Sequence, residues 1–193
     1  MRAEAPHPLL AKVIPAAEAL IREKHFSIEN LCHAADCGLR ELGEAVGTVD
    51  DVIAHVNDRF MAAYAAQAQG LAAAEGDDLK AVMGLCSLWL DHALAHPQNM
   101  DLLMMHRWQP SFQRPDWYLA RVNACFAPME ARLAKLAPHA APAAVAGAAR
   151  SLYAHICGLY FLSSNERAKP AGIESIRQLL QLTVTLLARG LAA

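Results

Sequence analysis

The chain has 193 residues, of which 55% are hydrophobic and 19% charged, and its mean hydropathy is +0.17. This composition supplies enough apolar side chains for a sizeable core and excludes an intrinsically disordered chain. The formal charge of −2 and the isoelectric point near 6.5 give no overall basic signature of a nucleic-acid-binding protein. Alanine and leucine, both strong helix formers, carry most of the apolar weight, so the composition indicates a helical globular protein.

Apolar residues recur with the helical period of 3.6 along the chain, and no segment sustains the period of two that is typical of a strand. Ser27 and Thr48 are good N-caps, Gly47 is a typical helix end, and the His96–Pro97 pair stops a helix because a residue before proline disfavours helical angles. The predicted fold is all-α with about nine helices, over residues 9–25, 28–36, 39–46, 49–69, 79–95, 98–108, 116–137, 142–163 and 173–191. The stretch 70–78 is predicted to be a loop.

The N-terminus does not fit a secretory signal, because Glu4, Lys12 and three prolines interrupt the apolar run that such a signal requires. The longest uncharged apolar stretch, 151–165, falls short of the roughly 20 residues that a membrane-spanning helix needs. We therefore expect a cytoplasmic protein without a membrane partner. The five cysteines are then expected to be reduced.

Two spacings could hold a metal ion, and neither is specific. Cys32 and Cys37 form a C-x4-C pair, but no second pair of similar ligands completes a zinc site. His92 and His96 are four residues apart without the glutamate of an H-E-x-x-H motif, which favours hydrogen-bonded histidines. We predict no metal site, no cofactor and no catalytic residues, since no nucleophile–base set, carboxylate pair or phosphate-binding glycine loop is recognisable. An enzyme on a helical scaffold is the weakest alternative.

The short helices 28–36 and 39–46, joined by a turn with Gly38, have the plan of a helix-turn-helix, although an ordinary αα corner has the same pattern. The run AAEALIREKHF (Ala16–Phe26) followed by AADCGLREL resembles the start of TetR-family transcriptional regulators. The segments DHALAHPQNMDLLMMHRW and LYAHICGLYFLSSNE are similar to later helices of that family. The resemblance covers nearly the whole chain.

This resemblance implies a TetR-like, ligand-responsive transcriptional regulator, of repressor type, that binds a DNA operator as a homodimer and senses a small hydrophobic effector. It divides the chain into a helix-turn-helix domain, 1–48, and an effector-binding and dimerisation domain, 49–193, with helix 49–69 connecting the two. The DNA-contacting positions that it implies are Lys24, Ser27, Arg40, Glu41, Glu44 and Thr48.

The later helices carry the expected effector site and dimer seam. Methionines and aromatic residues at helical spacing could line an adaptable apolar cavity, or could be ordinary core. The candidate ligand-binding residues are Met83, Trp89, His92, Met100, Met104, Met105, Trp108, Trp117, Tyr118 and Phe126, with His106 as a further polar group. The last helix is apolar nearly all round, so it must be buried on two sides. The expected dimer-interface residues are Tyr153, Ile176, Leu180, Thr183 and Leu187.

Charge argues against tight DNA binding. Between Pro15 and Asp58 the sequence holds nine carboxylates and three basic side chains, a formal charge of −6. DNA affinity comes largely from cations that displace counterions from phosphates, so this segment is poorly suited to a DNA backbone. The alternative is a TetR-fold protein with a degenerate, acidic helix-turn-helix, which binds a lipid-like ligand or a protein partner without binding DNA.

Overall fold

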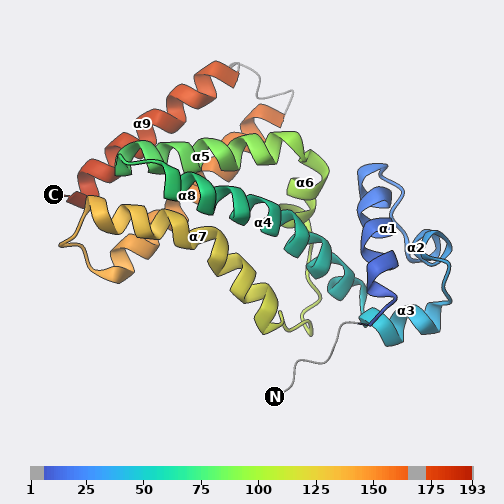
Figure 1. The fold of residues 1–193 in the computed structure, drawn as a ribbon. Helices are drawn as coiled ribbons and strands as arrows, with labels where there is room; N and C mark the ends of the chain where they lie inside the picture. The colour runs from blue at the N-terminus through green and yellow to red at the C-terminus, as the bar shows by residue number, and fades with distance from the viewer. Residues whose placement is uncertain (1–6, 165–172, 193) are drawn as a thin grey trace. The chain divides into compact units, whose positions relative to one another are not determined.

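The computed structural model describes residues 7–164 and 173–192, and over these residues it consists of helices without strands (Figure 1). The prediction of an all-α fold with about nine helices is confirmed. The described helices are α1 (Leu10–Arg22), α2 (Ile28–Ala35), α3 (Leu39–Val46), α4 (Val49–Ala74), α5 (Asp78–Ala95), α6 (Pro97–Met105), α7 (Asp116–Leu136), α8 (Pro142–Ser164) and α9 (Ile173–Ala192). Within this described part, no helix combines the length and the hydropathy that crossing a membrane would require.

The chain divides into two compact units, and unit 1 is discontinuous in sequence. Unit 1 comprises Met1–Phe60 and Pro97–Leu119, and unit 2 comprises Met61–His96 and Ala120–Ala193. This division differs from the predicted boundary after residue 48, because the first part of α4 and the whole of α6 pack with α1–α3. The predicted domain ranges also include residues 1–6, 165–172 and 193, which lie outside the described residues.

The core of unit 1 joins its first four helices. Ala17, Leu31, Leu42 and Val56 come from α1, α2, α3 and α4 respectively, and each is buried in one apolar cluster. Trp108, from the segment after α6, packs against this cluster as a partly buried side chain. Burial of a large aliphatic side chain contributes about 1.5–3 kcal/mol, so this cluster is what holds the three short helices together.

Helix α4 is longer than predicted, because the stretch 70–74 is helical and not part of a loop. Leucine and alanine favour the helix there. The Leu71 side chain also packs on α5 at Gly84, where an added Cβ would lie 3.2 Å from it. The connection to α5 is consequently reduced to residues 75–77, and Asp77 caps α5 by accepting a hydrogen bond from the backbone N–H of Lys80.

Unit 2 is centred on buried aromatic rings from three helices. Tyr64 of α4, Trp89 of α5 and Tyr153 of α8 pack edge to face, with centroids 4.6–6.1 Å apart. The Tyr153 hydroxyl lies 2.6 Å from both the Tyr64 hydroxyl and the carbonyl oxygen of Cys125. Burial raises the pKa of both phenols, so they stay protonated hydrogen-bonding groups at neutral pH.

Candidate functional site

The segment α2–turn–α3 has the form of a helix-turn-helix that local hydrogen bonds hold in place. The Ser27 hydroxyl accepts from the backbone N–H of Asn30 at 3.1 Å and so caps the start of α2. Helix α2 ends at Asp36, which has left-handed backbone angles (φ 53°). Helix α3 then begins after Gly38, whose N–H donates to Glu41 Oε2 at 2.8 Å. The turn geometry therefore comes from capping within the segment itself.

The predicted DNA-contacting residues all lie on unit 1, but most of them interact with neighbouring groups. Arg40 Nε donates to Glu44 Oε1 at 2.8 Å, in a pair whose side chains are 89% and 62% exposed. Glu41 caps Gly38, and the hydroxyls of Ser27 and Thr48 serve as helix caps. Lys24 is exposed after α1 with φ 60°. Helix α3 thus presents an ion pair and a second carboxylate at its surface.

Apolar side chains share the outer surface of this segment. Leu39 is 68% exposed and Val49 is 39% exposed. Both border a hollow of about 250 Å³ whose lining includes the buried side chains of Leu42 and Val52. Gly43 also lines this hollow, and a Cβ added there would have no neighbour within 4 Å. Exposed aliphatic side chains suit contact with apolar groups and contribute nothing to phosphate binding.

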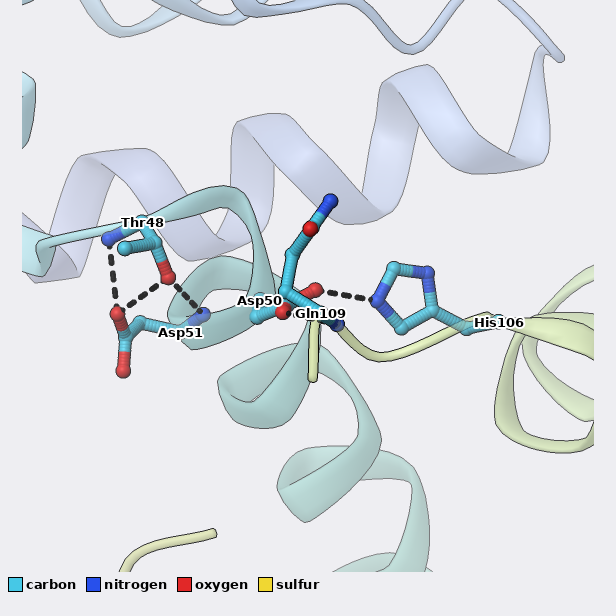
Figure 2. A network of polar contacts seen from close by, with 5 residues as sticks. All are labelled: Thr48, Asp50, Asp51, His106 and Gln109. Carbon is cyan, nitrogen blue, oxygen red and sulfur yellow. Dashed lines mark hydrogen bonds and ion pairs between the residues drawn. The ribbon is translucent and has the colours of Figure 1, made fainter. Parts of the chain in front are cut away.

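A polar network surrounds the first turn of α4 (Figure 2). The Thr48 N–H and hydroxyl donate to Asp51 Oδ2 at 2.8 and 2.6 Å, and the Asp51 N–H donates back to Thr48 Oγ1 at 3.2 Å. Asp50 is 3% exposed, and its side chain points toward the segment after α6. Its Oδ2 accepts from the Gln109 N–H at 2.8 Å, and its Oδ1 lies 2.7 Å from His106 Nε2. Asp50 therefore ties the start of α4 to the end of α6.

Sequence reasoning identified His106 only as a polar group beside the expected effector site, and it missed Asp50 and Gln109. Asp50 is 56 positions from His106 and 59 positions from Gln109 along the chain, so no local sequence pattern connects them. A hollow of about 500 Å³ adjoins this network, and its lining includes Phe112 and Arg107. The available signal was a carboxylate beside the apolar residues Val52 and Ile53 at the start of the helix, because a carboxylate that becomes buried must find a partner.

Six of the predicted ligand-binding residues belong to unit 1, and they differ widely in exposure. Met100 and Tyr118 are buried, whereas Met104 and Met105 on α6 are 41% and 66% exposed. Trp108 and Trp117 both make ring contacts. The centroid distances are 5.0 Å from Trp108 to Phe112, 5.8 Å from Trp108 to Tyr118 and 4.6 Å from Trp117 to His55. Burial lowers the pKa of His55 and favours its neutral form in the stack.

The other four predicted ligand-binding residues belong to unit 2. Trp89, His92 and Phe126 are part of the aromatic core there, with Phe126 at 4.5 Å from the Tyr153 ring. Met83 on α5 is half-buried. Tight ring packing is what an ordinary core requires, so the expectation of an effector cavity among these residues stays a prediction.

Part of the predicted dimer interface is buried within a single chain. Tyr153, Ile176 and Leu180 are 7%, 1% and 2% exposed, so they have almost no side-chain surface for a partner subunit. Thr183 is half-buried and its hydroxyl lies 3.0 Å from His155 Nε2, while Leu187 is half-buried. These residues face inward because α9 packs on α5 and α8. The surface leucines of α9 are instead Leu179, Leu182 and Leu186, which are 45–59% exposed.

The structure places both residue pairs whose spacing could suit a metal ion, His92 with His96 and Cys32 with Cys37. The rings of His92 and His96 are 5.0 Å apart and nearly edge to face. Cys32 and Cys37 are both half-buried thiols. Among the described residues, no group of three or more His, Cys, Asp or Glu side chains converges as a metal site.

Comparison with known proteins shows the fold and nothing finer. No protein-family profile and no curated protein matches this sequence. A solved structure of a protein with unknown function from Rhodococcus sp. RHA1 is similar to the chain, with a TM-score of 0.74 and 14% sequence identity, and the match covers 100% of both chains. At this identity the likeness establishes that the two chains share a fold.

Proposed function

We propose that this protein is a TetR-like, ligand-responsive transcriptional regulator that senses a small hydrophobic molecule and acts as a homodimer. The observation that carries the proposal is that unit 1 combines a helix-turn-helix with α6 in one compact body. A regulator needs a DNA-reading element that is mechanically joined to a ligand-sensing element. The resemblance of the sequence to TetR-family regulators points the same way.

The Asp50 network supplies a physical connection for such a response. Helix α6 carries the predicted effector residues Met100, Met104 and Met105, and His106 follows it directly. His106 and Gln109 both bond to Asp50 in the first turn of α4, which follows α3 after Gly47 and Thr48. A ligand that binds better to one position of α6 would therefore shift the start of α4 as well.

DNA titration at several salt concentrations tests the proposal. We expect weak binding of a random-sequence duplex with a shallow log–log salt dependence, because few cations on α3 can displace counterions. Replacing Glu44 by Gln releases Arg40 from its ion pair, so Glu44→Gln should bind more tightly and with a steeper slope. Glu23→Gln, the same charge change at the C-cap residue of α1, is the matched control. A slope of about −6 or steeper for the unaltered protein would show that the charge argument is wrong.

A second candidate function is favoured by the paired charges and exposed leucine on α3. In this alternative the chain is a TetR-fold protein that binds a lipid-like molecule or another protein and does not bind DNA. Arg40 is engaged with Glu44, and Leu39 is 68% exposed where a DNA-binding surface would carry polar groups. Absence of duplex binding at low salt, both in the unaltered protein and in Glu44→Gln, would favour this candidate over the first.

A further inference from the structure

Two thiols meet at the joint between α2 and α3. Helix α2 ends with the left-handed residue Asp36, and the Cys37 N–H then donates to the carbonyl oxygen of Cys32 at 3.0 Å. In this type of helix end the side chains of the two hydrogen-bonded residues lie on the same side of the joint and are frequently in contact. The Cys32 thiol is close enough to raise the pKa of Cys37. The local backbone therefore holds a dithiol together, although four residues separate the cysteines in sequence.

This pair is accessible from solvent. Cys32 and Cys37 are each half-buried, and Cys37 also lines a hollow of about 440 Å³. The charged and titratable residues around that hollow are His7, Lys12, Asp36, Glu41 and Glu44. With three carboxylates and one lysine in its lining, the hollow is negatively charged, so it repels an anionic reagent but admits a small uncharged one.

The other three cysteines are placed differently. Cys86 and Cys125 are buried, and burial raises the pKa of Cys86 to about 12. Cys157 is half-buried, and burial raises its pKa too. A raised pKa slows the oxidation of these thiols, as it does for Cys37, because the thiolate is the nucleophile. The Cys32–Cys37 pair is therefore distinguished by its two neighbouring thiols and not by a more reactive one.

We propose that Cys32 and Cys37 are an oxidative modification site, at which a small hydroperoxide converts the two thiols into an intramolecular disulfide. Cys37, which lines the hollow, loses its proton and attacks the peroxide, so that the O–O bond breaks, hydroxide leaves and a sulfenic acid forms. The Cys32 thiol then attacks the Cys37 sulfur, the S–O bond breaks and water leaves. In sum, two thiols are oxidised to one disulfide while hydrogen peroxide is reduced to two molecules of water.

The surroundings set the rate of this reaction. Burial, the neighbouring Cys32 thiol and the carboxylates of Glu41 and Asp36 all raise the pKa of Cys37. The pair is therefore a slow site at neutral pH, and its oxidation accelerates as the pH rises and the thiolate fraction grows. The substitution Glu41→Gln removes one of these charges and should accelerate oxidation, while the Gln side chain can still cap Gly38.

The disulfide would cross-link the last turn of α2 to the residue before the N-cap of α3. This modification is independent of whether unit 1 binds DNA or a protein. Its effect on the chain is to restrict the joint between the two helices, which the reduced protein holds only by hydrogen bonds and side-chain packing.

Peptide mapping tests the proposal directly, because no lysine or arginine lies between His25 and Arg40. A single tryptic peptide, residues 25–40, therefore contains both cysteines. The native protein is treated with hydrogen peroxide, quenched with catalase, alkylated with iodoacetamide and digested. We expect this peptide to lack both alkyl groups and to be lighter than the reduced peptide by two hydrogen atoms. Cys157→Ser is the control variant and should give the same product.

Other products would overturn the proposal. A peptide that stays doubly alkylated, one that carries sulfinic or sulfonic acid on Cys37, or one linked to a second chain would each show that the pair does not close. A glutathione redox titration supplies an equilibrium measurement. The thiols of the folded protein should be at least about tenfold easier to oxidise than those of the isolated 25–40 peptide, because the helix end preorganises them. Equal or weaker oxidation in the folded protein would contradict the inferred contact.

Discussion

The buried Asp50 carboxylate is the most informative single group to remove. In Asp50→Ala, the His106 ring and the Gln109 N–H lose their acceptor, at heavy-atom distances that were 2.7 and 2.8 Å. A hydrogen bond to a charged group contributes about 1.5–3 kcal/mol, and the two share one carboxylate, so their effects are not fully additive. We expect Asp50→Ala to lower the free energy of unfolding by roughly 3 kcal/mol.

Urea denaturation of the full chain measures this loss, with far-ultraviolet circular dichroism as the signal. Tryptophan fluorescence gives a second signal, since Trp108 contacts the His106 ring at 4.8 Å between centroids. Glu44→Ala is the matched control, because it also removes a carboxylate from an ion pair but at an exposed site, where the loss should stay within about 0.5 kcal/mol.

A double-mutant cycle isolates the contact between Asp50 and His106. The variants are Asp50→Ala, His106→Ala and the combination of both, and we expect a coupling free energy of about 1 kcal/mol or more. If Asp50→Ala costs no more than the Glu44→Ala control and the cycle shows no coupling, the network does not join α4 to α6 in solution. The proposed connection between ligand and helix-turn-helix would then lose its basis.

Three further predictions concern helix stability, pH dependence and oligomeric state. Gly43→Ala should stabilise the protein by about 0.5–1 kcal/mol in thermal unfolding, since the new methyl group meets no neighbour within 4 Å. Gly47→Ala should destabilise the protein, because φ at this position is +96° and the added Cβ would lie 2.7 Å from the Asp51 Oδ2 atom. Burial lowers the pKa of His55 below 6.5, so near that pH the unfolded chain binds more protons than the folded one. The free energy of unfolding should therefore fall as the pH drops through 6.5 and below, and His55→Gln should flatten this pH dependence. Leu186→Glu should yield a folded monomer in light scattering, whereas Leu180→Glu should unfold the chain; an unaltered protein that is monomeric at micromolar concentration would contradict the homodimer.

Local sequence signals predict the elements of this fold well. The apolar period identifies the helices, and capping residues such as Ser27 and Thr48 place their starts, because these features depend on neighbours within one turn. The end of α4 was missed because Leu71 is stabilised by packing on Gly84, a contact between different helices. In the sequence alone, Gly70 within an alanine-rich run predicts the end of a helix, and only the packing between helices shows that the helix continues.

The candidate site was predictable to a smaller degree, because its geometry depends on pairs distant in sequence. Composition shows that the first sixty residues are acidic, and the structure adds that Glu44 is paired with Arg40. The apolar pattern of α9 does not distinguish its two faces. Leu180 and Leu182 have the same chemistry in the sequence, and only the packing of α9 on α5 and α8 decides that the first is buried and the second is exposed.

The interrupted course of unit 1 has a consequence for how this chain is made and dissected. During synthesis the segment that ends at Phe60 leaves the ribosome well before Leu102 and Trp108, which cover part of its core. The apolar cluster around Val56 can be completed only after residues 97–119 have emerged, so unit 1 cannot finish folding before its second segment has been synthesised. A fragment cut after Phe60, or a chimera that exchanges only the first sixty residues, would carry an uncovered core, and an exchange of the helix-turn-helix must transfer both segments together.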